Sequence, residues 1–179
     1  MALLEVREDF EKYLTDYKAV PFDGIDYHHI CSSSHNYMAV GFPSSKNGLR
    51  YGTNHVKRKI YGYTGKMSDS SVFDKMSINP MSHVIINFRK DKLISLDQKV
   101  ITFPDPYGIS GGGIWLIENI SFNRNLQVKK PKLVAISIEW KKRHKCLLGI
   151  STATIIEMLK THTNIIPIQG MMTNLIFLR

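Results

Sequence analysis

Short apolar runs separated by turn residues recur along most of the chain. A strand is predicted where apolar and polar residues alternate, or where a short run of large apolar residues is bounded by turn signals. Such runs occupy 36–42, 56–63, 82–88, 100–103, 114–117, 133–140 and 145–150. The charged turn at 141–144 joins the last two into a predicted hairpin. Many short strands with turns between them are typical of a β-barrel or β-sandwich, and their order does not fit alternating β and α units.

Helical spacing of apolar residues occurs near both ends of the chain. Residues 8–17 predict a short helix and residues 152–161 a second one. Ser151 is the expected N-cap of the second helix. Residues 2–6 look like the end of a buried strand, and 64–80 predict a polar loop. The expected apolar face of the second helix consists of Ile155, Ile156 and Leu159.

Composition narrows the class of protein. Of the 179 residues, 43% are hydrophobic and 22% charged, which excludes a disordered chain and allows one domain with a real core. Cys31 and Cys146 lie in or beside apolar runs without zinc or redox spacing, so buried free thiols are expected. No apolar run approaches the ~20 residues that span a membrane, and the first residues lack signal-peptide features. A cytoplasmic protein without a membrane partner is the expectation.

The net charge of +9 raises a further alternative. Basic residues cluster at 57–59, 129–132 and 141–145, and such clusters can bind nucleic acid. These clusters lie at turns and strand ends with few aromatic residues between them. Solvated loop charges are the favoured interpretation, and a basic nucleic-acid-binding module stays as an alternative.

The stretch from 104 to 115 contains the most informative chemistry. A serine hydroxyl becomes a useful nucleophile when a base accepts its proton and backbone N–H groups face the oxygen that turns negative. Gly108, Ser110, Gly111 and Gly112 form a Gly-x-Ser-Gly-Gly pattern, in which the glycines permit the tight bends that such donors need. A plain glycine turn between two strands would have the same residues without any catalytic role.

Two other catalytic or binding motifs fit the stretch less well. The Gly-x-Ser-x-Gly elbow of α/β-hydrolases needs a strand before the serine and a helix after it. Here prolines precede Ser110 and a β-rich run follows it. A phosphate-binding loop would need a helix N-terminus or a following Lys-Ser/Thr pair, and neither is present.

Residues 108–115 resemble the nucleophile segment of trypsin-like serine peptidases, especially bacterial ones. Residues 37–43 resemble the strand ending in Gly-x-Pro that opens the second barrel of these proteins, and the order of elements over 36–162 is similar. The resemblance implies a mostly β fold, a chymotrypsin-like six-stranded antiparallel β-barrel with a C-terminal α-helix over 36–179. Residues 1–35 would be a remnant strand and linker from the first barrel.

The resemblance also implies roles for single residues. Ser110 would be the nucleophile that forms an acyl-enzyme during hydrolysis of a peptide bond in a peptide or protein substrate, without a cofactor or metal. The N–H groups of Gly108 and Ser110 would form the oxyanion hole. The border of the primary specificity pocket would contain Asp105, Tyr107, Ile138, Glu139 and Trp140.

Two positions depart from the family pattern. Ile109 stands where digestive members carry an aspartate that pairs with a freed N-terminus after zymogen cleavage, so that mode of activation is not expected. Gly113 stands where proline is common. Both changes are typical of a divergent branch.

The histidine and aspartate of the triad have no counterpart in the sequence. The Thr-Ala-x-His context is absent, and residues 1–6 resemble the Asp-Ile-Ala-Leu-Leu strand without its aspartate. The expectation is a truncated product or a misassigned start, inactive unless another chain or self-association supplies the first barrel. A non-catalytic binding or assembly domain derived from a peptidase is the close alternative.

A base from within the chain would have to be one of its seven histidines. His28 and His29 are the preferred candidates and His83 the next. The group formed by His28, His29, Cys31 and His35 matches no standard metal site.

Overall fold

The computed structural model describes residues 20–46, 48–49, 56–57, 59–89, 93–94, 100–102, 104–118 and 129–162. The predicted strand at 2–6 and the predicted helix at 8–17 lie outside these residues.

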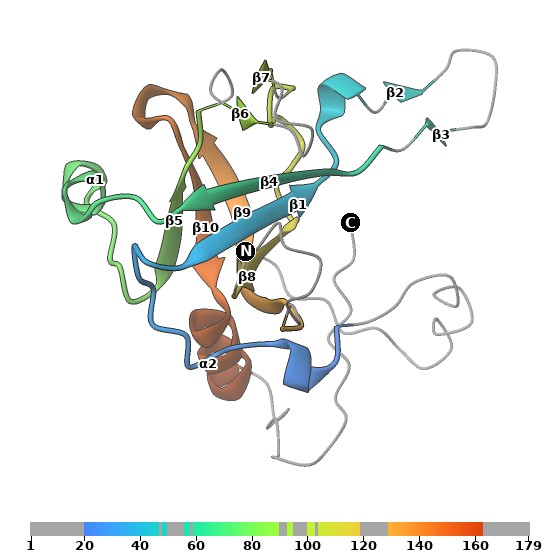
Figure 1. The fold of residues 1–179 in the computed structure, drawn as a ribbon. Coiled ribbons are helices and arrows are strands. Elements are labelled where there is room, and N and C mark those ends of the chain that lie inside the picture. The colour runs from blue at the N-terminus through green and yellow to red at the C-terminus, as the bar shows by residue number, and fades with distance from the viewer. Residues whose placement is uncertain are drawn as a thin grey trace, which may run out of the picture.

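Six antiparallel strands form one curled sheet, a half-barrel, in the order β4–β1–β8–β9–β10–β5 (Figure 1). Met67 makes an antiparallel bridge to Ile86, so the two ends of the strand order approach each other. Short pairs β2–β3 and β6–β7 lie outside this sheet. The strands of the sheet are β1 (Asn36–Gly41), β4 (Tyr61–Lys66), β5 (His83–Asn87), β8 (Gly113–Ile117), β9 (Lys132–Lys141) and β10 (Cys146–Ser151). The short strands are β2 (Gly48–Leu49), β3 (Val56–Lys57), β6 (Leu93–Ile94) and β7 (Val100–Ile101).

The core lies inside the curl of the sheet. Alternate residues of β1 and β8 point into it, as the period of two along a strand requires. Strands β5, β9 and β10 are buried on both faces, because their outer faces pack against helices or the N-terminal segment. The central cluster contains Tyr37, Ala39, Tyr63, Val84, Ile86, Phe88, Ile109, Ile114, Leu116, Val134, Ala135 and Leu147.

The prediction of a polar loop at 64–80 is wrong in two respects. Strand β4 continues to Lys66, and helix α1 (Ser70–Met76) follows it. The helix has seven residues, too few for a clear helical period in the sequence. Phe73 is its buried residue and packs on the outer face of the sheet.

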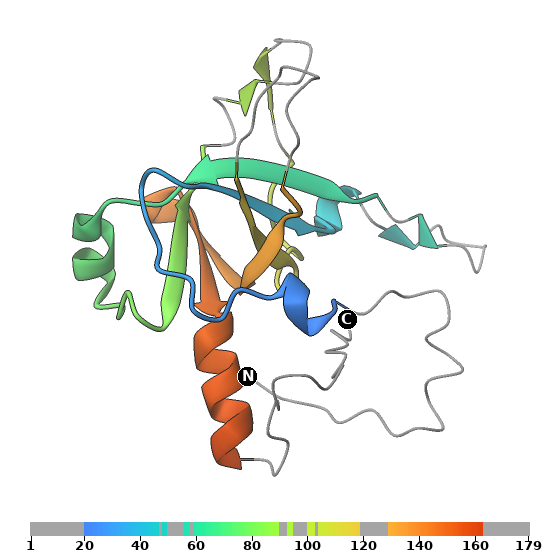
Figure 2. The same ribbon diagram turned by 60° about the horizontal axis from the view of Figure 1, so that its bottom comes forward.

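Helix α2 (Thr152–His162) confirms the second predicted helix and extends from one end of the half-barrel (Figure 2). The Thr154 N–H donates to the Ser151 hydroxyl at 3.2 Å, which is the predicted cap. Ile155, Ile156 and Leu159 are buried, as the apolar spacing predicts. No helix in the described part of the chain is long and apolar enough to cross a lipid bilayer.

The described part of the N-terminal segment, residues 20–35, packs against the sheet and α2. Ile25 is buried beside Leu133 and Ile156, and the Asp26 N–H donates to the Leu133 carbonyl at 2.9 Å. The Thr152 hydroxyl is within 3.0 Å of the Asp26 carbonyl. This segment is therefore held where strand β10 passes into helix α2.

Candidate active site

Ser110 lies in the second of two consecutive β-turns that lead into β8. The first turn closes with a 3.0 Å hydrogen bond from the Ile109 N–H to the Pro106 carbonyl. The second closes with a 2.9 Å hydrogen bond from the Gly112 N–H to the Ile109 carbonyl. Ile109 thus belongs to both turns, and the serine side chain is exposed beyond it.

Both turns have type II geometry. Their third residues, Gly108 and Gly111, have φ of +85° and +84°. Their second residues, Tyr107 and Ser110, are not among the residues with positive φ. A type II turn requires a positive φ at its third position, which explains why glycine stands at both places.

Strand β9 fixes one side of these turns. The Gly111 N–H donates to the Ser137 carbonyl and the Ser137 N–H donates to the Gly112 carbonyl, each at 2.8 Å. The Ser110 hydroxyl donates to the Ile138 carbonyl at 2.9 Å. The serine is therefore held against a strand backbone, and its hydroxyl proton is directed at a carbonyl rather than at a base.

Strand β1 fixes the other side through close steric contact. Ile109 is almost fully buried, with 1% of its surface exposed. A Cβ atom on Gly41 would lie 2.4 Å from the Ile109 Cγ1, and a Cβ on Gly112 would lie 2.1 Å from the Val40 carbonyl oxygen. Glycine at 41 and 112 therefore allows Ile109 to enter the core and the second turn to rest on β1.

Some of the residues predicted to border a specificity pocket lie together beside Ser110. The exposed Tyr107 ring meets the Trp140 ring edge-on, with centroids 5.8 Å apart. Ile138 is the acceptor of the serine hydroxyl. The Tyr107 ring and the serine hydroxyl therefore both contact β9, two residues apart along the strand.

The two acidic residues of the predicted border are placed differently. Glu139 is about half exposed and forms a 2.6 Å ion pair with Lys141. An exposed pair of this kind contributes little to stability. Asp105 is partly buried just before the first turn.

Sequence reasoning missed two polar atoms beside the turns. The Ser137 hydroxyl and the Trp140 indole N–H are buried without a hydrogen-bond partner among the described residues. Neither residue is unusual in the sequence, because their burial depends on how β9 packs against the turns.

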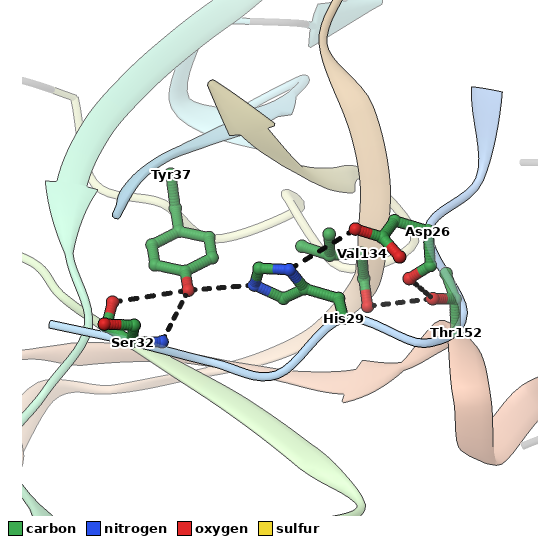
Figure 3. Close-up of polar contacts among 6 residues, drawn as sticks. All are labelled: Asp26, His29, Ser32, Tyr37, Val134 and Thr152. Atoms are coloured by element: carbon green, nitrogen blue, oxygen red, sulfur yellow. Dashed lines mark hydrogen bonds and ion pairs between the residues drawn. The ribbon is translucent and has the colours of Figure 1, made fainter. Parts of the chain in front are cut away.

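His29, one of the two preferred candidate bases, lies in a separate polar network (Figure 3). Its Nδ1 is 3.5 Å from an Asp26 carboxylate oxygen, and its Nε2 is 3.0 Å from the Tyr37 hydroxyl. The Ser32 N–H donates to the same hydroxyl at 3.1 Å. With its proton on Nδ1 facing the carboxylate, the neutral imidazole can accept a hydrogen bond from the Tyr37 hydroxyl at Nε2. Both ring nitrogens of His29 are therefore already in use.

The network favours a neutral imidazole at physiological pH. Burial lowers the pKa of His29 most strongly, and the Asp26 carboxylate opposes this effect. The neighbouring His35 lowers the same pKa, whereas Glu118 raises it. Burial also raises the pKa of Tyr37, so its hydroxyl remains protonated and continues to bridge His29 and Ser32.

We expect this histidine to make the fold less stable in mild acid. Its pKa in the folded protein lies below the ordinary value of 6.5, so the unfolded chain binds a proton more readily. Stability should therefore decline as pH falls below about 6.5 and continue to decline until the folded-state pKa is passed. Urea unfolding at about pH 7.5 and about pH 5.5 should show a smaller loss for His29→Gln than for wild type.

The exposed His28 supplies the matched control for that measurement, because His28→Gln removes a neighbouring imidazole outside the network. Its variant should keep the acid sensitivity of the wild type. Equal acid sensitivity in His29→Gln and wild type would contradict the assignment.

Three other described histidines also have contacts away from the serine. His28 stacks against Tyr27 with centroids 4.1 Å apart, and the His83 Nδ1 is 2.8 Å from the Ser82 hydroxyl. His35 lies beside His29, 5.4 Å between ring centroids. In the described part of the chain, no histidine is hydrogen-bonded to Ser110, and no group of three or more His, Cys, Asp or Glu could hold a metal ion.

Both cysteines are free thiols. Cys146 is buried and Cys31 is partly buried. Burial raises the pKa of Cys31, and it raises the pKa of Cys146 to about 11. Thiols with such values are poor nucleophiles at neutral pH.

No protein-family model matches this sequence, and no curated protein shows significant similarity to it. The function of the site therefore has to be argued from the two turns and from the resemblance of residues 108–115.

Proposed function

We propose that this protein contains the nucleophile-bearing barrel of a chymotrypsin-like serine peptidase, with Ser110 as the residue that attacks the peptide carbonyl. The curled antiparallel sheet followed by a C-terminal helix agrees with the fold that this function requires. The general base would come from the first barrel, which lies outside the described residues and would be supplied by a longer chain or by a partner. The substrate would be a peptide or protein.

The paired type II turns are the observation that carries the proposal. They leave the backbone N–H groups of Gly108 and Ser110 without an acceptor among the described residues, and the Ser110 side chain is exposed beside them. Unpaired N–H groups in a rigid turn can stabilise the negative oxygen of a tetrahedral intermediate. The central N–H groups of any β-turn are free, so the exposed serine beside them is the feature that favours a site over a plain glycine turn.

The serine hydroxyl would have to leave the Ile138 carbonyl before it reacts. Its 2.9 Å hydrogen bond to that carbonyl is the ground state of a site without its base. An imidazole delivered by the first barrel would compete for the hydroxyl proton and rotate Oγ towards the substrate. Tyr107 and Trp140 would then contact the side chain that precedes the cleaved bond.

Labelling with a fluorophosphonate tests the proposal. Loss of the triad histidine lowers turnover by about 10⁶-fold, while donors and binding leave a residue of catalysis. We therefore expect very slow labelling of the full chain, confined to one serine, and none for Ser110→Ala. Mass spectrometry of the labelled peptide should locate the probe on Ser110.

Ser71→Ala is the matched control, because Ser71 is another exposed serine, on helix α1. Its labelling should equal that of the wild type. Labelling that survives in Ser110→Ala, or a complete absence of labelling in wild type, would contradict the proposal.

A non-catalytic binding domain derived from a peptidase is the second candidate. It is favoured by the Ser110 hydroxyl pointing at the Ile138 carbonyl and by both nitrogens of His29 being engaged elsewhere. It predicts no labelling under any condition and a normally folded Ser110→Ala variant.

A further inference from the structure

The peptide group between Tyr107 and Gly108 is held by a residue distant in the sequence. The Ser44 N–H donates to the Tyr107 carbonyl oxygen at 2.6 Å. Ser44 is the first residue of a short 3-10 helix, Ser44–Lys46, that follows β1. The segment that follows β1 therefore contacts the first turn directly.

This contact determines where the Gly108 N–H points. A trans peptide is planar, so its N–H and C=O point in opposite directions. Because the Tyr107 carbonyl is directed at Ser44, the Gly108 N–H is directed away from it. No described residue accepts that N–H.

The opposite orientation is the obvious competitor. Rotating this one peptide group by about half a turn converts a type II turn into a type I turn with the same closing hydrogen bond. A carbonyl would then occupy the place of the N–H and would repel a negative oxygen. A group that favours the observed orientation therefore controls whether the donor exists.

We propose that the Ser44 backbone N–H is the positioning group that keeps the Gly108 N–H available as an oxyanion donor. The inference rests on the proposed function for one point, that the donor binds an oxyanion; the orientation of the N–H does not depend on it. It makes Ser44 a positioning residue and not a catalytic one, because it acts through the Tyr107 carbonyl.

Ile109 supports the same conclusion from the other end of the turn. Its side chain is buried in the core against Gly41, so an apolar anchor fixes the residue that follows Gly108. Neither the anchor nor the Ser44 contact requires a newly cleaved N-terminus. The donor is therefore set by the folded barrel before any substrate arrives.

A matched pair of variants separates the N–H of Ser44 from its side chain. Ser44→Pro removes the N–H, and proline is tolerated at the first position of a helix. Ser44→Ala keeps the N–H and removes a side chain that is exposed. Any effect of the hydroxyl itself appears in both variants.

Nuclear magnetic resonance reads the orientation without any need for activity. We expect a through-hydrogen-bond scalar coupling between the Ser44 nitrogen and the Tyr107 carbonyl carbon in wild type and in Ser44→Ala. In Ser44→Pro, the residual dipolar coupling of the Gly108 N–H should change while those of β8 and β9 stay constant. Fluorophosphonate labelling should slow by about 10²-fold in Ser44→Pro and stay unchanged in Ser44→Ala, the loss expected for one oxyanion donor.

The outcomes distinguish the two proposals. Absence of the coupling in wild type, or an unchanged Gly108 orientation in Ser44→Pro, overturns the role of Ser44. If wild type shows the coupling but never labels, the positioning role stands and the peptidase function fails. Should Ser44→Pro fail to fold, the coupling in wild type alone decides.

Discussion

Gly112→Ala should cost the fold about 3 kcal/mol or more, because the new methyl group would overlap main-chain atoms. Its Cβ would lie 2.1 Å from the Val40 carbonyl oxygen and 2.9 Å from the Ile109 carbonyl oxygen. A flexible side chain could move away, but these oxygens belong to β1 and to the second turn. Urea unfolding followed by circular dichroism should show either a large drop in the midpoint or no cooperative transition.

Alanine variants of two other glycines show whether the loss of stability in Gly112→Ala comes from the overlap with main-chain oxygens. Gly62 lies on β4 with only the Met38 side chain near its Cβ position, at 3.4 Å, so Gly62→Ala should change stability by less than about 1 kcal/mol. Gly111 has open space around it but a φ of +84°, so Gly111→Ala should cost about 1–3 kcal/mol through backbone strain. A Gly112→Ala variant as stable as Gly62→Ala would mean that the second turn does not rest on β1.

The local pattern of apolar and polar residues was sufficient to predict most strands of the sheet and the last helix. The predicted strand at 36–42 is β1, the predicted hairpin is β9 and β10, and the predicted N-cap Ser151 bonds to Thr154. These elements combine clear periodicity with turn or cap residues at their ends. Prediction failed at α1, since one buried phenylalanine in a seven-residue helix leaves no period to detect.

The glycines of residues 108–112 predict tight bends, and the structure places two turns there. Gly108 and Gly111 take the positive φ that these turns require. The catalytic and oxyanion roles assigned to Ser110 and Gly108 stay predictions until they are measured. The border residues of the predicted pocket likewise stay predictions.

The contacts that hold the site could not be read from the sequence. Ser44 and Tyr107 are far apart along the chain, as are Gly41 and Ile109, and their pairing depends on how β1 passes beneath the turns. The same holds for His29, whose partner Tyr37 belongs to β1 while the histidine lies in the N-terminal segment. Long-range packing, and not local propensity, decides which polar groups meet.

Ile109→Asp tests whether the buried anchor shared by the two turns must be apolar. By the proposed resemblance, digestive peptidases carry an aspartate at the matching position. The buried cluster around Ile109 consists of apolar and aromatic residues. An unpaired carboxylate buried there should destabilise the fold by about 3–5 kcal/mol at neutral pH.

The pH dependence of that variant should run opposite to the effect of His29. Burial without a cation would raise the pKa of the new carboxyl above the ordinary ~3.9 for aspartate. The folded state then binds a proton at a pH where the unfolded state does not, so stability rises as pH falls through the raised pKa.

Ile109→Asn has a side chain of nearly the same shape without the charge, and the acid effects of His29 act equally on both variants. The stability gap between the two should therefore narrow from about pH 7.5 to about pH 5 in urea unfolding. A gap that is absent at both pH values would instead show that the carboxylate at position 109 does not lie uncompensated in the apolar cluster.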